Sequence, residues 1–544
     1  MSGVNRRQLL RTATAAASGV VAGLGLDTPV SAAEGAAEAG CTPPLGPVKA
    51  GPDDARYAYL VQRGQKRWVG TPDHVWVVGS TEQVVAAVQE AVDSGEKIAV
   101  RSGGHCAEGW VDDPAVRVLI DMSGMTQVSY DPARRAFAVE PGATLGEVYR
   151  RLVLGWGVTI PAGWCPGVGA GGHICGGGYG VLSRAMGLVV DHLYAVEVVV
   201  VGKDGKASAV VATREASDPN RELWWGHTGG GGGNFGVVTR YWLRTRGAEG
   251  SDPGQLLPRA PKSAIAFSSQ WPWQALKLDE PKFTRLIRNH MDWCERNSAV
   301  GAAATRLYAD LTVGRKVNDL NLASGQVFGP DADELLDDYL AALGAGVGTP
   351  VNVVRTEQPW LAAALDGPNS DIYRLKIKSG YLRKGFSDAQ LAAVYENLTR
   401  EQDPKLLFGS VGIASYGGQI SAVAPDATAF PHRDAVMRVQ YTAAWADPGQ
   451  DATYVEWLRR LYREIYADTG GVPDPKDGAY INYPDDDLAD PAVNTSGVPW
   501  STLYFKDNYP RLQKVKATWD PKNIFSHTLG IEPPKATRDG RRRP

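Results

Sequence analysis

Three glycine-rich runs in the sequence contain residue types suited to binding a phosphate-bearing ligand. They occupy residues 101–106, 161–180 and 229–236, and each stands next to β-rich sequence. Successive backbone N–H groups in such turns can cradle a pyrophosphate without a basic side chain. None ends in the Gly-Lys-Ser/Thr of an NTPase loop or opens a dinucleotide-binding βαβ unit with G-x-G-x-x-G. A single run is often only a tight turn, but three in one region favour a common ligand.

A histidine and a cysteine stand within these runs. His105 ends an R-S-G-G-H sequence that begins at Arg101, and Cys165 lies near the start of the second run. Judged alone, His105 would be a hydrogen-bonded histidine in a turn and Cys165 a small buried apolar side chain. The motif around each residue decides between this interpretation and a chemical role.

These motifs resemble the vanillyl-alcohol-oxidase-type, or PCMH-type, FAD-binding domain, and specifically the berberine-bridge-enzyme-like oxidases. In that family R-S-G-G-H supplies a histidine joined to the flavin 8α-methyl group. A cysteine in G-x-C-P-x-V-G-x-G-G-H-x-x-G-G-G-Y-G is joined to flavin C6, and residues 163–180 match every fixed position. Segments 232–239 and 508–525 also match the family. The resemblance therefore implies a covalent FAD with an 8α-histidyl bond to His105 and a 6-S-cysteinyl bond to Cys165.

The resemblance also implies which residues surround the cofactor. They are Arg101, Ser102, Gly103, Gly104, His105, Cys165, Gly169, Gly171, Gly172, His173, Gly176, Gly177, Tyr179, Gly236, Val237, Val238, Tyr483 and Asn523. Cys106 and Cys175 lie in the same runs but away from the family positions, so we expect them to be packing residues. No C-x-x-C or His/Cys cluster has zinc-ligand spacing, and no metal site is expected.

Residues 479–485 resemble the family's Y-x-N-Y-x-D segment, whose second tyrosine lies over the flavin. Tyr483 is therefore the candidate base that takes the substrate's hydroxyl proton. A free tyrosine has a pKa of about 10, so it needs a cationic or hydrogen-bonding neighbour to act near neutrality. Tyr179, the second tyrosine expected to be catalytic, is a candidate for that neighbour, and so is the pair Lys376 and Lys378. The alternative is that Tyr483 is a buried aromatic residue with a satisfied hydroxyl.

The activity implied by the resemblance is oxidation of a hydroxyl-bearing small molecule. A secondary alcohol or lactol would become a ketone or lactone by hydride transfer to flavin N5, and O2 would be reduced to H2O2. Segments 111–114, 220–225 and 494–500 resemble a subgroup of actinobacterial oxidases that act on sugars or lactols of polyketide antibiotics. Where that subgroup has a tyrosine implicated in a second oxidation, this sequence has Ala414. A single oxidation step is therefore expected.

Besides a pyrophosphate-binding module without flavin, which would leave the motifs around His105 and Cys165 unexplained, three other functions remain open from the sequence. Two are enzymatic: a free carbohydrate oxidase that makes lactones, and an oxidative ring-closing enzyme. The third is a flavin-bearing protein that sequesters an antibiotic without turnover, against which the presence of Tyr483 argues.

The hydrophobic pattern predicts an α+β fold whose texture changes near residue 253. Before that point, strands at 74–78 and 98–100 flank a helix at 81–93, and 198–211 is typical of a hairpin. After it, helices at 283–294, 333–343 and 453–467 alternate with strands at 305–312, 373–378 and 437–445. This alternation predicts an antiparallel sheet with helices on one face. With the resemblance, it implies a two-subdomain FAD-binding domain and a substrate domain whose sheet roofs the flavin.

We expect six segments along the chain. They are a twin-arginine-type signal peptide at 1–32, a leader at 33–54, the FAD-binding domain at 55–246, the substrate-binding domain at 253–480, a return to the FAD domain at 481–533 and a basic tail at 534–544. Arg6-Arg7, an apolar stretch and Val30-Ser31-Ala32 indicate export, an alternative being an ordinary basic tail. The protein is therefore expected to be secreted or extracytoplasmic after passing the twin-arginine machinery.

Composition narrows the range of partners. With a net charge of −3, the chain has no basic field to recruit nucleic acid. Beyond the N-terminus no stretch is apolar enough to span a bilayer, so no membrane anchoring is expected. Five cysteines in 544 residues do not suggest a disulfide framework. The expected partners are a hydroxylated small molecule and O2.

Overall fold

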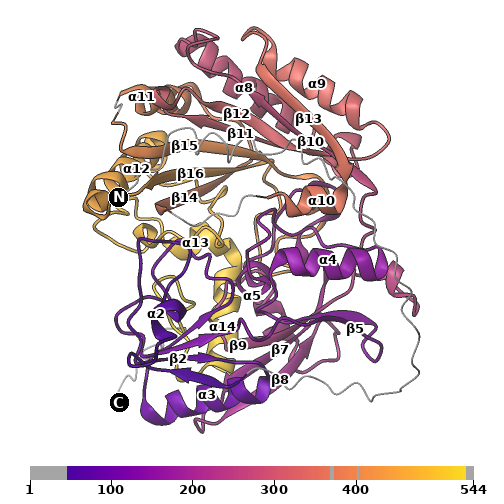
Figure 1. The fold of residues 1–544 in the computed structure, drawn as a ribbon, viewed down its shortest axis with the longest axis vertical. Helices are drawn as coiled ribbons and strands as arrows, with labels where there is room; N and C mark the ends of the chain where they lie inside the picture. The colour runs from indigo at the N-terminus through magenta and orange to yellow at the C-terminus, as the bar shows by residue number, and fades with distance from the viewer. Residues whose placement is uncertain (1–45, 368–372, 401–402, 535–544) are drawn as a thin grey trace, which may run out of the picture.

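The computed structural model describes residues 46–367, 373–400 and 403–534, which form two lobes (Figure 1). One lobe holds two small sheets, and the other holds a seven-stranded sheet covered by helices. The predicted α+β class is confirmed. The expected signal peptide and residues 535–544 of the expected basic tail lie outside the described residues.

The first sheet has the strand order β1-β2-β4-β3 and begins earlier in the chain than expected. Its strands are β1 (Val48–Ala50), β2 (His74–Val77), β3 (Ile98–Arg101) and β4 (Val118–Asp121). The short helix α2 (Tyr57–Leu60) lies between β1 and β2 in the chain. The pairs β2–β4 and β3–β4 are parallel, and β1 pairs antiparallel with β2. The expected leader at 33–54 is therefore too long, because β1 already forms main-chain hydrogen bonds at the edge of this sheet.

Helix α3 (Thr81–Ser94) packs against this sheet, as the sequence predicts. Ser80 caps the helix by accepting a hydrogen bond from the N–H of Gln83, and Gly95 ends it with a φ of 69°. Val84 and Val88 are fully buried in the core between the helix and the strands. Because β3 runs directly into the first glycine-rich run, this packing fixes where that run begins.

The second sheet is antiparallel, with the order β5-β6-β9-β7-β8. Its strands are β5 (Val128–Asp131), β6 (Ala136–Val139), β7 (Leu193–Val201), β8 (Ala207–Thr213) and β9 (Val237–Leu243). The helices of this part of the chain are α4 (Leu145–Trp156), α5 (Ala170–Cys175), α6 (Ser183–Met186) and α7 (Arg221–Gly226). β7 and β8 form the predicted hairpin.

The C-terminal part of the chain returns to the same lobe through α13 (Trp500–Phe505) and α14 (Tyr509–Trp519) (Figure 1). The buried ammonium of Lys516 donates to the backbone oxygen of Asn234 at 2.7 Å and pairs with Asp520 at 2.6 Å. Arg511 pairs with Glu222 at 2.6 Å. These contacts join α14 to the third glycine-rich run and to α7.

The other lobe is built on an antiparallel sheet with the order β13-β10-β12-β11-β15-β16-β14. Its strands are β10 (Ser263–Gln270), β11 (Leu307–Gly314), β12 (Asn321–Val327), β13 (Val351–Pro359), β14 (Arg374–Leu382), β15 (Leu406–Ser415) and β16 (Met437–Trp445). Its helices are α8 (Glu280–Arg296), α9 (Ala332–Gly344), α10 (Trp360–Leu365), α11 (Asp388–Arg400) and α12 (Asp451–Ile465). The long helices cover the outer face of the sheet (Figure 1).

The elements predicted for this lobe are largely confirmed. The three predicted helices correspond to α8, α9 and α12, and the strand predicted at 437–445 has the same bounds as β16. The strand predicted at 305–312 starts two residues later, because Ala303–Arg306 forms a 3-10 turn. The strand predicted at 373–378 continues to Leu382, because β14 pairs with β16 over its whole length.

The two faces of this sheet differ in chemistry. On β11, Leu311 is fully buried, whereas Asp310 and Thr312, which lie on the opposite face, are half-buried. Directly paired residues share a face. The pairs Asp310–Ala414 and Ala414–Arg438 therefore place Arg438 on the same face as Asp310. This face meets the lobe with two small sheets, because the Arg438 guanidinium lies over the ring of Tyr179.

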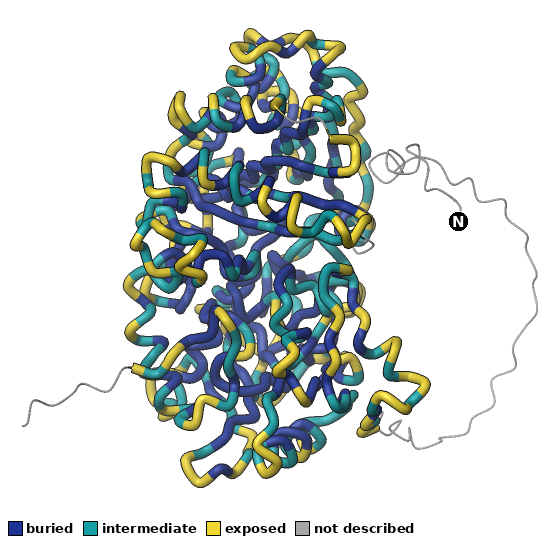
Figure 2. The backbone as a smooth tube through the Cα atoms, turned by 90° about the vertical axis from the view of Figure 1, so that its left-hand side faces the viewer, coloured by how far each residue is buried: buried dark blue, intermediate teal, exposed yellow. Residues whose placement is uncertain are grey.

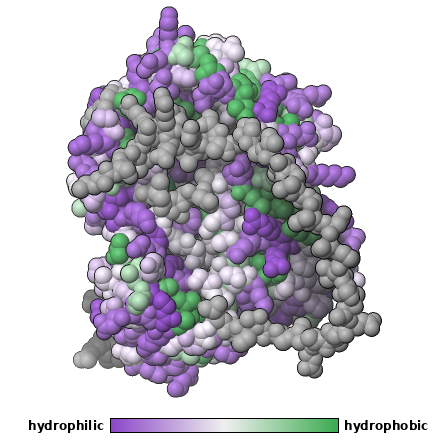
Figure 3. Space-filling model, viewed as in Figure 1, coloured by the Kyte–Doolittle hydropathy of each residue, from purple (hydrophilic) through white to green (hydrophobic). Residues whose placement is uncertain are grey.

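Burial and hydropathy agree with this division. Buried backbone runs through the strands of both lobes and the region between them, and exposed segments lie at loops and outer turns (Figure 2). The surface in Figure 3 is mainly hydrophilic, with hydrophobic residues in small separate groups. No helix among the described residues is long and apolar enough to cross a membrane.

Candidate active site

The loop that carries His105 is fixed at its base by a buried ion pair. Arg101, the last residue of β3, lies with its Nε 2.8 Å from the carboxylate of Asp121 on β4. The hydroxyl of Ser102 donates to a backbone oxygen at 2.5 Å. Gly104 has a φ of 73°, a left-handed conformation that favours glycine. These residues shape the loop, and His105 follows in a half-buried position.

The loop with His105 lies directly against the loop with Cys165. A Cβ on Gly103 would lie 2.3 Å from the backbone nitrogen of Gly169, so any side chain would force the two loops apart. Cys165 is half-buried, like His105. The two candidate attachment residues thus stand on neighbouring loops, as a doubly attached ligand requires.

The second glycine-rich run contains both packed and open positions. A Cβ on Gly171 would touch the side chain of Ser102 at 3.1 Å, and Gly177, with a φ of 115°, lies against the ring of Phe430. Gly172 is exposed, and a Cβ there would meet no atom within 4 Å. Among these glycines, Gly172 therefore borders open space at the first turn of α5.

His173 connects the cysteine-bearing loop to the C-terminal return segment. Its Nε2 accepts a hydrogen bond from the N–H of Gly163 at 3.1 Å, and burial lowers the pKa of His173 to about 4. Its backbone oxygen accepts from the Asn482 amide at 3.0 Å. A Cβ on Gly176 would lie 1.9 Å from the Asn482 side-chain oxygen. A neutral imidazole and a bare glycine thus allow the segment after residue 480 to pack against this loop.

The remaining expected cofactor residues lie in the third run and after α14. Gly236 has a φ of 154°, and a Cβ there would lie 2.4 Å from the backbone oxygen of Val199. Val237 and Val238 begin β9 and are buried. Asn523 is an exposed turn residue with a φ of 54°. Their packing shapes the lobe, and none has a reactive group.

Tyr483 is half-buried where the return segment passes beneath the sheet. Its ring lies 5.4 Å from that of Tyr480, with the planes inclined at 70°. The guanidinium of Arg438 lies 4.7 Å from the ring of Tyr483 and 5.0 Å from that of Tyr179. The phenol of Tyr483 is therefore accessible and faces a cation.

Arg438 is the functional candidate that the sequence interpretation missed. It is 5% exposed, and its Nε and Nη1 have no hydrogen-bond partner among the described residues. Burial opposes its charge, but Tyr483, Tyr179 and Tyr308 outweigh burial and raise the pKa of Arg438 well above its ordinary value. An arginine within the predicted strand 437–445 was the available signal, but without the register nothing linked it to Tyr483.

Tyr179 forms a wall of this site and keeps its proton. Its hydroxyl donates to the backbone oxygen of Ser415 at 2.6 Å. Burial raises the pKa of Tyr179 above its ordinary value, although Arg438 partly opposes this. Of the two tyrosines expected to be catalytic, Tyr483 is thus the one with an accessible phenol.

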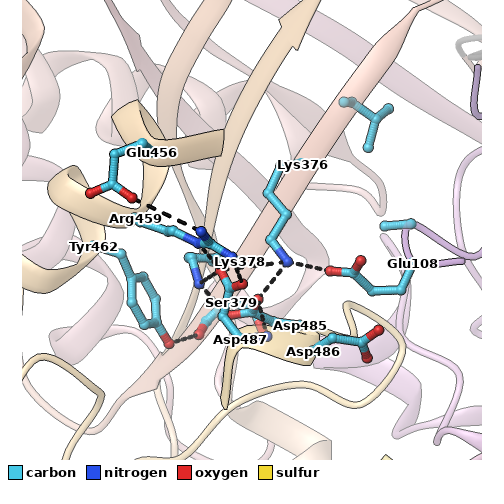
Figure 4. Close-up of polar contacts among 12 residues, drawn as sticks. Glu108, Lys376, Lys378, Ser379, Glu456, Arg459, Tyr462, Asp485, Asp486 and Asp487 are labelled. Carbon is cyan, nitrogen blue, oxygen red and sulfur yellow. Dashed lines mark hydrogen bonds and ion pairs between the residues drawn. The ribbon is translucent and has the colours of Figure 1, made fainter. Parts of the chain in front are cut away.

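Lys376 and Lys378, the other candidates to tune Tyr483, point elsewhere. They lie on the face of β14 opposite to Arg438, and they contact Glu108, Asp485 and Asp487 (Figure 4). No contact found in the described part of the chain joins either lysine to the Tyr483 phenol. The expectation of direct tuning by these lysines was wrong, because alternate residues of a strand point to opposite faces.

Cys106 and Cys175 have the surroundings of packing residues. Burial raises the pKa of Cys106 to about 12 and that of Cys175 to about 11. Cys175 lies 3.0 Å from the hydroxyl of Tyr241. Within residues 46–367, 373–400 and 403–534, no group of histidine, cysteine and carboxylate residues could hold a metal ion.

The residues present fit a flavin. Two loops in contact offer a half-buried imidazole and a half-buried thiol, and Gly172 leaves open space beside them. Across from these loops, buried nitrogens of Arg438 lack partners within the described chain, as expected of groups that face a ligand. A planar ligand attached at the loops would lie under the polar face of the seven-stranded sheet.

Comparison with known proteins agrees with this arrangement. The family model for the FAD binding domain matches residues 72–208, and the model named berberine and berberine like matches residues 479–532. Over 489 residues the chain is 53% identical to the aclacinomycin-N/aclacinomycin-A oxidase of Streptomyces galilaeus, covering 88% of this chain and 89% of that protein. This chain is a berberine-bridge-enzyme-like FAD oxidase.

Two further relatives support the assignment of this oxidase. The crystal structure of a glycopeptide hexose oxidase complexed with teicoplanin matches with a TM-score of 0.87 at 52% identity, covering 91% of this chain and 100% of that chain. The hexose oxidase of Chondrus crispus is 32% identical over 542 residues, covering 89% of this chain and 95% of that protein. The family resemblance, the PCMH-type fold and the FAD-linked oxidase class predicted from the sequence are confirmed.

Proposed function

We propose that this oxidase carries FAD attached to both His105 and Cys165 and converts a secondary alcohol or lactol to a ketone or lactone. The supporting observation is the half-buried phenol of Tyr483 beside the buried guanidinium of Arg438, where the cysteine-bearing loop meets the sheet. FAD, when bound, supplies the two-electron acceptor that takes hydride at N5 and passes the electrons to O2, giving H2O2.

Tyr483 takes the hydroxyl proton of the substrate. A phenol acts as a base near neutral pH only when its negative charge is stabilised. The Arg438 guanidinium, 4.7 Å from the ring, supplies that stabilisation. The protonated phenol of Tyr179 closes the site on the other side of Arg438 and excludes water from the charged pair.

The proposed substrate is a sugar carried by an antibiotic. One relative is named for aclacinomycins and another for a glycopeptide hexose. The polar face of the sheet suits sugar hydroxyls. Thr312 donates to the carboxylate of Asp310 at 2.8 Å, and Gln440 donates to Thr442 at 3.1 Å, in half-buried positions.

A single oxidation per substrate is proposed because of Ala414. It is directly paired with Arg438 and lies on the same face, so it adjoins the proposed base. A methyl group cannot transfer a proton. Stoichiometric formation of a doubly oxidised product by the purified enzyme would contradict this part of the proposal.

Free sugars are a second candidate substrate class, favoured by the 32% identity to the hexose oxidase of Chondrus crispus. Peroxide release from free hexoses and from antibiotic glycosides, compared at equal concentration, separates the two classes. Bleaching of the flavin by substrate in the absence of O2 would also exclude the function of sequestering an antibiotic without turnover.

We also propose export through the twin-arginine machinery, on the basis of Arg6-Arg7 and the apolar stretch that follows. Replacement of both arginines by lysine is expected to retain the protein inside the cell. An unchanged extracellular fraction would refute this.

The two covalent bonds are tested by intact mass and the absorption spectrum after acid precipitation. The wild-type protein is expected to be yellow and heavier by one FAD. His105→Ala and Cys165→Ala should each retain flavin, and only the double variant should lose it. A colourless protein of apo mass, purified from cells rich in flavin, would overturn the proposal.

A further inference from the structure

A second cluster of charged groups lies buried beside the proposed site but has no part in the chemistry assigned above. It contains Glu108, Lys376, Lys378, Arg459, Asp485 and Asp487, here named the Lys376–Lys378 cluster (Figure 4). The side chains of Glu108, Lys376, Lys378 and Asp485 are at most 3% exposed. Such complete burial of charge needs an explanation.

The contacts within the cluster are short and shared. The Lys376 ammonium pairs with Glu108 and lies 2.7 Å from Asp485. The Lys378 ammonium lies 2.6 Å from Asp485 and 2.6 Å from Asp487. Arg459 of α12 adds a contact of 2.6 Å to Asp487. Asp485 is therefore held by two cations, and Asp487 by three, since Lys376 also lies 3.6 Å from it.

The charges balance, three cations against three carboxylates. Burial opposes the charge of Lys376, but Asp485, Glu108 and Asp487 outweigh burial and raise its pKa. Burial also opposes the charge of Asp487, but Lys378 and Lys376 outweigh it and lower its pKa. Both shifts favour the charged forms of Lys376 and Asp487, as expected of groups held in ion pairs.

The cluster joins three segments that carry the proposed chemistry. Glu108 follows His105 by three residues, and Asp485 follows Tyr483 by two. The lysines lie on β14, where Tyr381 is paired with Arg438 of β16. The attachment loop, the base and the strand next to its cation are therefore all connected through one set of ion pairs.

The segment with Tyr483 has little regular structure of its own to hold it. After Tyr480 it forms only the 3-10 turn Asp486–Leu488. The Tyr483 N–H donates to the Tyr480 oxygen at 2.9 Å, and the Asp485 N–H donates to the Tyr504 hydroxyl at 3.0 Å. The side chains of Asp485 and Asp487 supply the contacts that fix this segment to the sheet.

We propose that the Lys376–Lys378 cluster is a set of positioning residues that fixes the phenol of Tyr483 relative to the flavin attachment loop. This inference rests on the proposed role of Tyr483 as the base. Its physical basis is that proton abstraction demands close alignment, and a misplacement of about 1 Å can lower a rate by about 100-fold.

The test uses a charge-balanced double variant, Glu108→Gln/Lys376→Met. Removal of one partner alone would leave an uncompensated buried charge and can prevent folding. Removal of both keeps the balance and the approximate volume. The matched control is Lys49→Met/Glu90→Gln, which deletes the ion pair between Lys49 of β1 and Glu90 of α3. The ammonium and carboxylate of this pair lie 2.5 Å apart, and the two side chains are 43% and 41% exposed.

The measurement is the rate constant of flavin reduction by substrate without O2, expressed per bound flavin, as a function of substrate concentration and pH. The double variant is expected to retain its flavin and reduce it about 10- to 100-fold more slowly, with substrate affinity changed by less than about threefold. The surface control should match the wild type. The single variant Lys376→Arg, which keeps the charge, is expected to reduce its flavin faster than the double variant does.

A wild-type rate constant per bound flavin in the double variant would overturn the proposal, even if the protein were less stable or only partly loaded. That result would make the cluster merely structural. Failure of the proposed function is recognised separately: Tyr483→Phe would then reduce flavin at the wild-type rate in the same assay.

Discussion

At the scale of single residues, the site depends on one cation that faces two phenols. Tyr179 and Tyr483 lie at similar distances from Arg438, yet they differ in access. Tyr179 is buried and donates to a main-chain oxygen, whereas Tyr483 is half-buried. The same guanidinium therefore contacts a wall residue on one side and the proposed base on the other.

Arg438→Met is expected to lower the rate of flavin reduction by about 10- to 100-fold at pH 7, because a desolvated charge contributes about 1.5–3 kcal/mol. Stopped-flow reduction from pH 6 to pH 10 measures the rate.

Arg438→Lys should recover most of the rate at pH 7, since it restores a positive charge. Arg134→Met is the matched control, because Arg134 lies over Trp242 at 4.4 Å, remote from the site. An unchanged profile in Arg438→Met would show that this cation does not assist the base.

At the scale of elements, the sequence predicted what depends on periodicity and local motifs. β16 begins with alternating apolar and polar residues, and α3 has a serine cap and a glycine end, so both could be placed from the sequence. The two loops proposed to carry the flavin could be recognised because glycine is required where two main chains touch. These signals are all contained within short stretches of chain.

What could not be predicted depends on which strands become neighbours. Arg438 reaches Tyr483 only because β16 lies second from the edge of the sheet, above the return segment. Lys376 and Lys378 were candidates to tune the base, but their face of β14 is fixed by pairing with β16, which the sequence does not reveal. Glu108 lies 268 residues from Lys376 along the chain, and no local pattern connects them.

The contact between the two proposed attachment loops leaves no room for an added methyl group. Gly103→Ala is expected to destabilise the protein by about 2–4 kcal/mol and to lower covalent flavin content, because main-chain atoms 2.3 Å from the new Cβ must move. Urea unfolding and intact mass measure the two effects.

The matched control for Gly103→Ala is Gly155→Ala in α4. A Cβ at Gly155 would meet no atom within 4 Å, and alanine is favoured over glycine in a helix by about 1 kcal/mol. This variant should be as stable as the wild type or more so, with full flavin content. Equal behaviour of the two variants would refute the close contact of the loops.

At the scale of the whole molecule, the two lobes are joined by main-chain and side-chain contacts at the outer edge of β14. The amide nitrogen of Gln65 donates to the oxygen of Leu375 at 2.9 Å, and the N–H of Leu375 donates back at 3.3 Å. Gln65 thus substitutes for a neighbouring strand. The sheet that covers the site is thereby fixed to the lobe that carries the attachment loops.

Asp486 stands at the same junction and should make the stability of the whole protein depend on pH. Its carboxylate accepts a hydrogen bond from Trp110 at 2.7 Å, and Trp110 stacks on His527 at 4.0 Å. Burial, followed by the charge of Glu108, raises the pKa of Asp486 to about 7, against the partial opposition of Trp110 and Lys376. The folded protein therefore holds this proton more tightly than the unfolded chain does.

The sign of the effect follows from linkage. A raised pKa gives stability that is fully present below the unfolded value of about 3.9 and is lost as pH rises through the folded value.

Asp486→Asn cannot ionise, and it keeps an oxygen for Trp110. Relative to the wild type, this variant should gain about 1–3 kcal/mol of unfolding free energy between pH 4.5 and pH 7.5, with no further gain above that range. Asp487, whose pKa is lowered, is present in both proteins, so its contribution cancels in the difference. Urea unfolding at intervals of half a pH unit measures the difference, with Asp490→Asn, an exposed neighbour, as the control that should show none. A constant difference between Asp486→Asn and the wild type across this range would mean that Asp486 is already ionised in the folded protein, and that the junction between the lobes carries a buried negative charge.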